Sequence, residues 1–315
     1  MSNLNAPHFQ DADKARQYLE AQVWPNGRTC PHCGVVGDHY ELKGKTNRPG
    51  LYKCTDCREP FTVTVGTVFE RSKIGLHIWL QAVFLINSSK KGMSAKQLER
   101  MLGVTYKTAW FMAHRIREAM TVKPVGMMGG NGSVVEADET YWGNGPRSQA
   151  GKKFLKNNGK KALQGGHQKE KIVSLVERGG QVRSFHVARV TGKTLKRVLT
   201  SNIAPETNLM TDAAQIYRPI GRLFNSHESV NHSVKEYVRG NVHSNTVEGY
   251  FSILKRGLIG TFHHVSPKHL GRYVEEFSFR YNHRTAMGYT DVERAAIAIK
   301  GASGKRLTYL PLASA

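Results

Sequence analysis

Residues 134–141 alternate between polar and apolar side chains, a pattern typical of a β-strand that packs one face against a core. The two-residue period gathers one set on a single face: Glu136, Asp138 and Thr140. The opposite face carries Val135, Ala137 and Glu139. A second apolar run, residues 208–210, is followed by Thr211 and Asp212 and then by a helical pattern. Asp138 and Asp212 are therefore both predicted to lie near strand ends.

Two further segments, residues 171–178 and 181–187, have the composition of strands and flank Gly179-Gly180. Two glycines between such runs predict a β-hairpin. Residues 191–201 then follow a helical pattern. The resulting order of strand, hairpin, helix and strand predicts a mixed sheet flanked by helices.

From Asn245 onward the pattern is helical. At 100° per residue one sector about 80° wide collects polar side chains. These are Asn245, Glu248, Ser252 and Lys255. Val247, Phe251 and Leu254 share another sector. This helix is predicted to bury its apolar face and to direct its polar face into a site.

Residues 74–120 form a helical block in which a turn at 102–104 separates two short helices. Ser94 and Gln97 match a capping box that opens the first helix, and Thr105 caps the second. This layout predicts a helix-turn-helix, whose second helix enters the DNA major groove, with a plain helical bundle as the alternative. In the second helix we expect Trp110, Ala113 and Ile116 to face inward. The side chains expected to remain outside are Tyr106, Lys107, His114, Arg115 and Arg117.

All four cysteines of the chain form a C-x2-C, 20-residue, C-x2-C pattern: Cys30, Cys33, Cys54 and Cys57. Two such knuckles bring four thiolates around a tetrahedral Zn²⁺, and the segments beside them are rich in β-formers. Four protein ligands leave no open position, so the predicted zinc is structural and the module is a zinc ribbon. Two disulfides are the alternative, which requires an oxidising compartment.

The charge balance is strongly basic, with 46 Lys and Arg against 24 Asp and Glu and a formal net charge of +22. A basic surface supplies the salt-dependent part of DNA affinity, although a ribosomal or other RNA-binding protein has the same signature. No apolar run reaches the roughly 18 residues of a membrane span, and the N-terminus lacks the features of a signal peptide. These features favour a cytoplasmic, nucleoid-associated protein with no membrane partner.

Residues 147–171 are rich in Lys, Arg and Gly and too polar to fold alone. We expect this basic loop to become ordered on DNA phosphates, and a merely solvated loop is the alternative. The lysines expected to contact DNA are Lys152, Lys153, Lys160 and Lys161.

Three acids are candidates for phosphodiester chemistry: Asp138, Asp212 and Glu248, with 35 residues between the last two and Lys255 seven residues after Glu248. Carboxylates suit two Mg²⁺ ions about 4 Å apart, which activate the attacking oxygen and stabilise the leaving one. Other interpretations remain. Asn245 and Glu248 fit the N-cap and N3 positions of a capping pair. Spacing excludes neither Glu136 nor Glu139 as the acid on the first strand.

The stretches VVEADETYWG, NLMTDAAQIY, HSNTVEGYFSILKRG and EEFSFRYNHR resemble the catalytic domain of bacterial insertion-sequence DDE transposases, in the family whose members carry an N-terminal zinc ribbon. The likeness spans residues 134–286, and roughly 280 residues when the ribbon is included. It implies an RNase H-like fold, with Asp138 and Asp212 as metal-binding aspartates and Glu248 as the third acid. Lys255 is implied as the lysine on the same helix. Some relatives carry asparagine at the third position, so Asn245 remains an alternative.

The sequence as a whole predicts a multidomain protein: an N-terminal helical lead (1–25), a zinc ribbon (26–70), a helix-turn-helix region (71–125), an RNase H-like catalytic domain (130–290) and a C-terminal tail (291–315). The predicted activity is binding of terminal inverted repeats, Mg²⁺- or Mn²⁺-dependent cleavage, and joining of 3′ hydroxyls to target DNA. Lys255 and Arg256 are expected to contact the DNA, and a dimer or higher oligomer is expected because two ends must meet. The alternatives are a zinc-ribbon transcription regulator with an inactive catalytic domain, and a nuclease that does not join strands.

Overall fold

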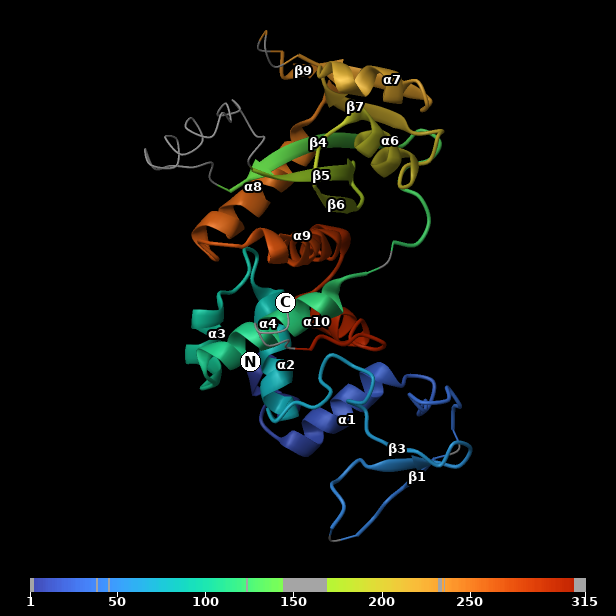
Figure 1. Ribbon diagram of the computed structural model, residues 1–315, viewed down its shortest axis with the longest axis vertical. Coiled ribbons are helices and arrows are strands. Elements are labelled where there is room, and N and C mark those ends of the chain that lie inside the picture. Colours follow the sequence, from blue (N-terminus) through green and yellow to red (C-terminus); the bar gives the residue numbers. More distant parts are fainter. Residues whose placement is uncertain are drawn as a thin grey trace, which may run out of the picture. The chain divides into compact units, whose positions relative to one another are not determined.

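The computed structural model describes residues 3–37, 39–44, 46–122, 124–143, 169–231, 234 and 236–308. The chain divides into two compact units (Figure 1). Unit 1 comprises Met1–Val122 and His283–Ala315, and unit 2 comprises Lys123–Asn282.

Unit 1 combines a small sheet with helices. Its strands are β1 (His39–Glu41), β2 (Tyr52–Cys54) and β3 (Pro60–Phe61), antiparallel in the order β1-β2-β3. Its helices include α1 (Ala12–Val23), α2 (Leu76–Ser88), α3 (Ala95–Leu102), α4 (Tyr106–Met120) and α10 (Asp291–Lys300). Short 3₁₀ turns are η1 (Asn3–Asn5), η2 (Pro7–Phe9) and η6 (Thr285–Met287).

The two helices predicted on either side of the turn are α3 and α4, which pack on each other. Ser94 caps α3 by accepting a hydrogen bond from the N–H of Gln97, and Thr105 caps α4 through the N–H of Thr108. Gly103 ends α3 with a φ of 65°, a left-handed conformation that glycine adopts without steric cost. Local capping signals therefore positioned both helices correctly.

The C-terminal segment expected as a tail contains a helix of unit 1. Thr290 and Glu293 form a complete capping box at the start of α10. The helix buries Ala295, Ala298 and Ile299, spaced as one face of a helix, and packs against α1, α2 and α4. Unit 1 therefore consists of two stretches of the chain, one before and one after unit 2 in the sequence.

Unit 2 is built on a five-stranded mixed sheet in the order β6-β5-β4-β7-β8. Its strands are β4 (Val134–Trp142), β5 (Glu170–Glu177), β6 (Val182–Val187), β7 (Asn208–Asp212) and β8 (Ser226–Val230). The β4–β5 and β5–β6 pairs are antiparallel, and β4, β7 and β8 run parallel. The hairpin predicted around Gly179-Gly180 is confirmed by the pairing of β5 with β6.

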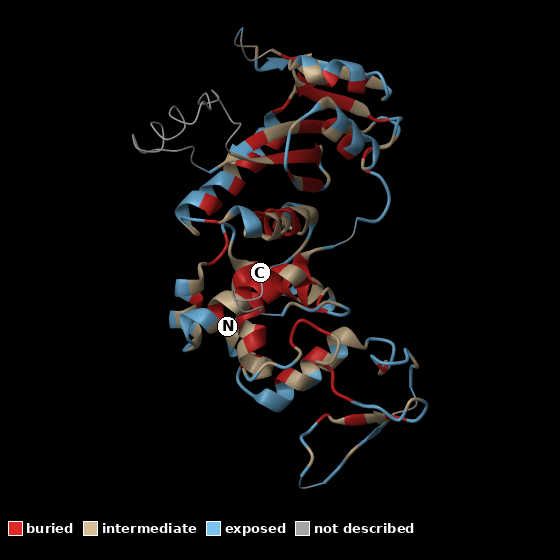
Figure 2. Ribbon diagram, viewed as in Figure 1, coloured by how far each residue is buried: buried red, intermediate tan, exposed pale blue. Residues whose placement is uncertain are grey.

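Helices cover both faces of this sheet. On one face α6 (Gly192–Thr200), the 3₁₀ turn η4 (Gln215–Tyr217) and α7 (Arg218–Gly221) share a core with Val135, Ala137 and Leu175. On the other face α8 (Asn245–Gly260) and α9 (Pro267–Asn282) pack on Ile172 and Val176. A small hairpin, β9 (Val238–Arg239) with β10 (Val242–His243), precedes α8. Buried positions follow the central strands, whereas α8 shows both buried and exposed positions (Figure 2). A mixed sheet flanked by helices on both faces confirms the fold class predicted from the sequence.

Candidate functional site

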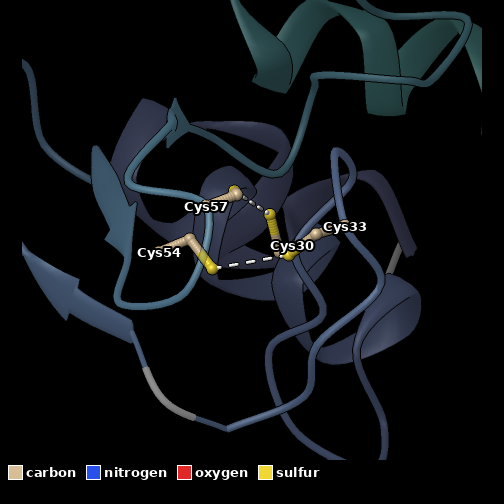
Figure 3. A group of neighbouring side chains, drawn as sticks. All are labelled: Cys30, Cys33, Cys54 and Cys57. Carbon is tan, nitrogen blue, oxygen red and sulfur yellow. Dashed lines mark hydrogen bonds between the residues drawn. The ribbon is translucent and has the colours of Figure 1, made fainter.

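The four cysteine side chains of unit 1 converge on one point (Figure 3). Their sulfur atoms all lie within 4.8 Å of one another, and the Sγ atoms of the pairs Cys30–Cys57 and Cys33–Cys54 are 3.6 Å apart. All four are free thiols, so the alternative of two disulfides is not realised. Four convergent sulfur ligands are the donor set of a structural zinc ion.

Aromatic side chains pack against this cluster. Tyr52 and Phe61 are buried and pack with Cys30 and Cys54, and Trp24 meets Phe61 edge to face at 5.9 Å between ring centroids. So few large apolar side chains make a small core, and metal coordination is the usual source of stability in a module of this size.

Asp138 and Asp212 lie at matched positions on neighbouring parallel strands. In the β4–β7 register, Glu136 pairs with Met210, and the two aspartates are the residues two positions further along each strand. Asp212 is the last residue of β7, and its Oδ1 accepts the N–H of Ala214 at 3.1 Å. The predicted position near a strand end is confirmed for Asp212. It is wrong for Asp138, which is the central residue of β4 and pairs with Ser174, because β4 continues along β5 as far as Trp142.

The environment of Asp138 disfavours its charged form. Burial raises the pKa of this carboxyl to about 7, and the negative charges of Glu139, Asp212 and Glu248 add to the rise. The backbone N–H of Glu139 acts in the opposite direction by donating to Asp138 Oδ1 at 2.7 Å. Acids from β7 and α8 therefore act on Asp138 of β4. A divalent cation would relieve their mutual repulsion.

Glu248 lies on the exposed face of α8. It is exposed to solvent, and its Oε1 accepts a 2.9 Å hydrogen bond from the hydroxyl of Ser244. Ser244 is the N-cap and Asn245 the first residue of the helix. Glu248 is therefore the fourth helical residue, and the capping pair considered from the sequence does not form. Asn245, Lys255 and Arg256 are also exposed, and Arg256 donates to the hydroxyl of Ser252.

The structure separates the two rival acids of β4. Glu136 is fully buried, and its carboxylate is hydrogen-bonded to Arg178 and to the first turn of α8. Glu139 accepts a 2.6 Å hydrogen bond from the hydroxyl of Tyr217, and burial raises its pKa. Spacing alone left both acids open. Asp138 is the acid of β4 on which the charges of both Asp212 and Glu248 act. Among the described hydrogen bonds, its carboxylate accepts none from a side chain.

Within the described ranges, the four cysteines are the only group of three or more potential ligands whose atoms are close enough to hold one ion as they stand. The carboxylates interact over longer range. Their donor set is nonetheless all oxygen, which fits Mg²⁺ or Mn²⁺ and not a soft metal.

The structure corrects the predicted outer face of α4. Tyr106 and Lys107 are exposed as expected, but His114, Arg115 and Arg117 are buried. The guanidinium of Arg115 donates to the carbonyls of Val68, Glu70 and Leu307 at 2.9 to 3.2 Å. His114 lies against Trp110, with ring centroids 4.1 Å apart. Arg115 and His114 are therefore structural in this unit and not free to contact DNA bases.

A cleft of about 370 Å³ opens beside the first turns of α4. Arg71, Lys73 and Lys107 line it together with the hydroxyl residues Ser72 and Thr108. Ile74, Trp79, Phe111 and Met112 also line the cleft, so its cationic and hydroxyl side chains stand beside an apolar surface. Residues 71–74 were not singled out from the sequence. The lysines of the basic loop, Lys152, Lys153, Lys160 and Lys161, lie outside the described residues.

Sequence reasoning also missed Arg178 and Thr246, which hold Glu136. No local pattern marks them, because their partner is 42 residues away in one case and 110 in the other.

Comparison with known proteins identifies relatives of both units. Residues 129–282 match the model of the ISXO2-like transposase domain, and residues 10–59 match that of the transposase zinc-ribbon domain. A protein of Halobacterium salinarum, described as an uncharacterized protein in transposable element ISH50, is 29% identical over 278 residues, covering 86% of this chain and 91% of that protein. A chain of the simian T-cell lymphotropic virus intasome in complex with PP2A regulatory subunit B56 gamma aligns at 12% identity, over 62% of this chain and 68% of that chain. Its TM-score of 0.28 does not establish a common fold.

Proposed function

This chain belongs to the family of transposases that join an N-terminal zinc ribbon to an ISXO2-like DDE domain, and from that membership we propose that it cuts and joins DNA at the ends of a mobile element. The observation that supports the proposal is that Asp138 and Asp212 each lie two residues beyond the paired residues Glu136 and Met210 of adjacent parallel strands, with Glu248 of α8 close enough to raise the pKa of Asp138.

The three carboxylates would hold two Mg²⁺ or Mn²⁺ ions, with Asp138 and Asp212 as the aspartate ligands and Glu248 completing the set. When bound, such ions lower the pKa of water and stabilise negative charge on phosphate oxygens. The protein positions the scissile phosphodiester beside the acids, and Lys255 and Arg256 on the exposed face of α8 contact the DNA backbone.

In the proposed first step a water oxygen attacks phosphorus and the bond to the 3′ oxygen breaks, which leaves a 3′ hydroxyl and a 5′ phosphate. In the second step that 3′ oxygen attacks a phosphorus of target DNA and displaces a target 3′ oxygen. In each step one oxygen forms a bond to phosphorus while the 3′ oxygen leaves and takes up a proton, so no covalent protein–DNA intermediate is needed.

Unit 1 is proposed to bind the terminal inverted repeats. In this proposal the exposed Tyr106 and Lys107 at the start of α4 contact bases, and Arg71 and Lys73 of the neighbouring cleft contact the adjoining phosphates. One structural Zn²⁺, held by the four cysteines, would stabilise the ribbon. The protein would act in the cytoplasm on nucleoid DNA, as a dimer or higher oligomer on two element ends. No helix among the described residues is long and apolar enough to cross a membrane.

The direct test is cleavage and joining of a labelled DNA that carries the element's terminal repeat, with Mg²⁺ and purified full-length protein. Strand cleavage followed by joined products supports the proposal. Specific binding without cleavage favours the transcription regulator. Cleavage without joined products favours the nuclease.

A further inference from the structure

Glu136 connects the strand that carries Asp138 to the helix that carries Glu248. It lies two residues before Asp138 on β4 and is completely buried. Its Oε2 accepts hydrogen bonds from the backbone N–H groups of Thr246 at 2.8 Å and Val247 at 3.0 Å. Its Oε1 accepts the hydroxyl of Thr246 at 2.9 Å. Both carboxylate oxygens are thus bound to the first turn of α8.

Arg178 holds the same carboxylate from the turn between β5 and β6. Its Nε donates to Glu136 Oε1 at 2.7 Å, and its terminal nitrogens donate to the carbonyls of Asn241 at 2.7 Å and His243 at 2.9 Å. The backbone N–H of Arg178 also donates to the carbonyl of Val134 on β4, at 3.0 Å. One ion pair therefore joins β4, the β5–β6 turn and the segment that leads into α8.

Electrostatics explain why a carboxylate belongs at this point. The first N–H groups of a helix have no partner within the helix and carry partial positive charge. Ser244, the N-cap of α8, makes no capping hydrogen bond with its side chain. Glu136 therefore caps α8 from a strand 110 residues earlier in the chain. Because the cap is a tertiary contact, it fixes where the helix begins relative to β4.

We propose that Glu136 is a positioning residue that sets the separation of Asp138 and Glu248 for a shared divalent cation. The inference rests on the proposed function. Glu136 has both oxygens committed to Arg178 and α8, so it acts through backbone placement and not as a ligand. Metal sites tolerate little misplacement of their ligands, and partners that orient the ligands typically change metal affinity by about 10- to 100-fold.

Glu136→Gln tests this role with little change in shape. The amide NH₂ must face either the two N–H groups of α8 or the guanidinium of Arg178, and it can accept a hydrogen bond from neither. The expected result is an affinity for Mn²⁺ about 10- to 100-fold weaker than that of the wild type. It is measured on zinc-loaded, full-length protein by the electron paramagnetic resonance signal of free Mn²⁺. Cleavage should recover at saturating Mn²⁺, because the ligands themselves remain.

Glu276→Gln is the matched control. Glu276 is also fully buried in unit 2 and accepts two 2.6 Å hydrogen bonds from Arg280, but both lie on α9. This variant should lower thermal stability and leave Mn²⁺ affinity unchanged. A loss of Mn²⁺ affinity equal in both variants would overturn the positioning role, since any lost buried ion pair would then suffice.

Two outcomes separate this inference from the proposed function. If wild-type protein binds Mn²⁺ and Asp138→Asn abolishes that binding, while folded Glu136→Gln binds as tightly as wild type, only the positioning role is wrong. If Mn²⁺ binding in the wild type is independent of Asp138, the proposed function is wrong. Should Glu136→Gln not fold, Thr246→Val deletes one donor and keeps the backbone contacts. Weaker Mn²⁺ binding by that variant supports the inference, and unchanged binding overturns it.

Discussion

The hydroxyl of Tyr217 donates a 2.6 Å hydrogen bond to Glu139, the residue that follows Asp138 on β4. The two neighbouring acids thus have different environments. Glu139 accepts a hydrogen bond from a buried phenol, whereas burial and three nearby acids raise the pKa of Asp138 to about 7.

In the absence of divalent metal, unit 2 should lose stability as pH rises from about 4 to about 7. The folded state retains the proton of Asp138 over that range while the unfolded state has released it, so raising the pH favours unfolding. At pH 8 the free energy of unfolding of Asp138→Asn should therefore exceed that of the wild type by at most about 4 kcal/mol, and at pH 4 the two should be equal. Thermal melts in a chelating buffer measure this, and a variant less stable at pH 8 would contradict it.

Replacing either aspartate should abolish chemistry and leave DNA binding intact. Since even partners of metal ligands matter by about 10- to 100-fold, Asp138→Asn or Asp212→Asn should slow Mg²⁺-dependent cleavage by more than about 100-fold. The measurement is cleavage of a repeat-end DNA beside a binding titration. Strand cleavage retained in either variant would remove that residue from the proposed site.

The third position is decided by comparing Glu248 with Asn245, both exposed in the first two turns of α8. Glu248→Gln should lose as much cleavage activity as the aspartate variants, because the charge of Glu248 acts on Asp138. Asn245→Ala should retain cleavage. The reverse pattern in the same assay would transfer the role to Asn245.

Metal analysis should find about one Zn²⁺ per chain in the ribbon. Cys54→Ser removes a buried ligand and should unfold the ribbon, because metal binding supplies much of the folding free energy of such modules. The circular dichroism of the sheet in unit 2 should persist, since that unit has its own core. Recovery of disulfides in place of zinc would refute the site.

Replacing Lys107 and replacing Arg115 should have different effects on DNA binding. Lys107→Ala should narrow the difference in affinity between terminal-repeat DNA and random DNA. Arg115→Ala should instead lower the thermal stability of unit 1, because three carbonyls lose a buried donor. A specificity change in Arg115→Ala without loss of stability would contradict the burial described above.

The basic loop has its own measurement. If Lys152, Lys153, Lys160 and Lys161 contact phosphates, replacing all four with alanine should weaken specific and random binding alike. Each lost contact flattens the slope of log K against log salt by roughly 0.9, so the total change is up to about 3 to 4. An unchanged slope would show that these lysines are only solvated.

Local patterns predicted much of the fold because the features concerned are local. The two-residue period of β4, the glycines between β5 and β6, and the caps at Ser94 and Thr105 each act within a few residues. The T-x-x-E box that opens α10 is equally local and readable, and residues 291–300 were nevertheless expected to be a tail.

Long-range contacts account for the differences. Arg115 was expected outside because a helical pattern shows which side chains share a face but not what covers that face. Its acceptors are 45, 47 and 192 residues away. The role of Glu136 likewise depends on distant residues, Arg178 and Thr246. From its position near Asp138 the sequence left Glu136 open as a metal ligand, whereas its contacts show that it caps α8.

The participation of α10 in unit 1 also bears on the order in which the protein can fold during synthesis. The apolar face formed by Ala295, Ala298 and Ile299 packs against helices from the first 122 residues. A ribosome must therefore translate all of unit 2 before the helical core of unit 1 can close. Nascent chains interrupted before residue 291 would leave the apolar surfaces of α1, α2 and α4 without this packing partner.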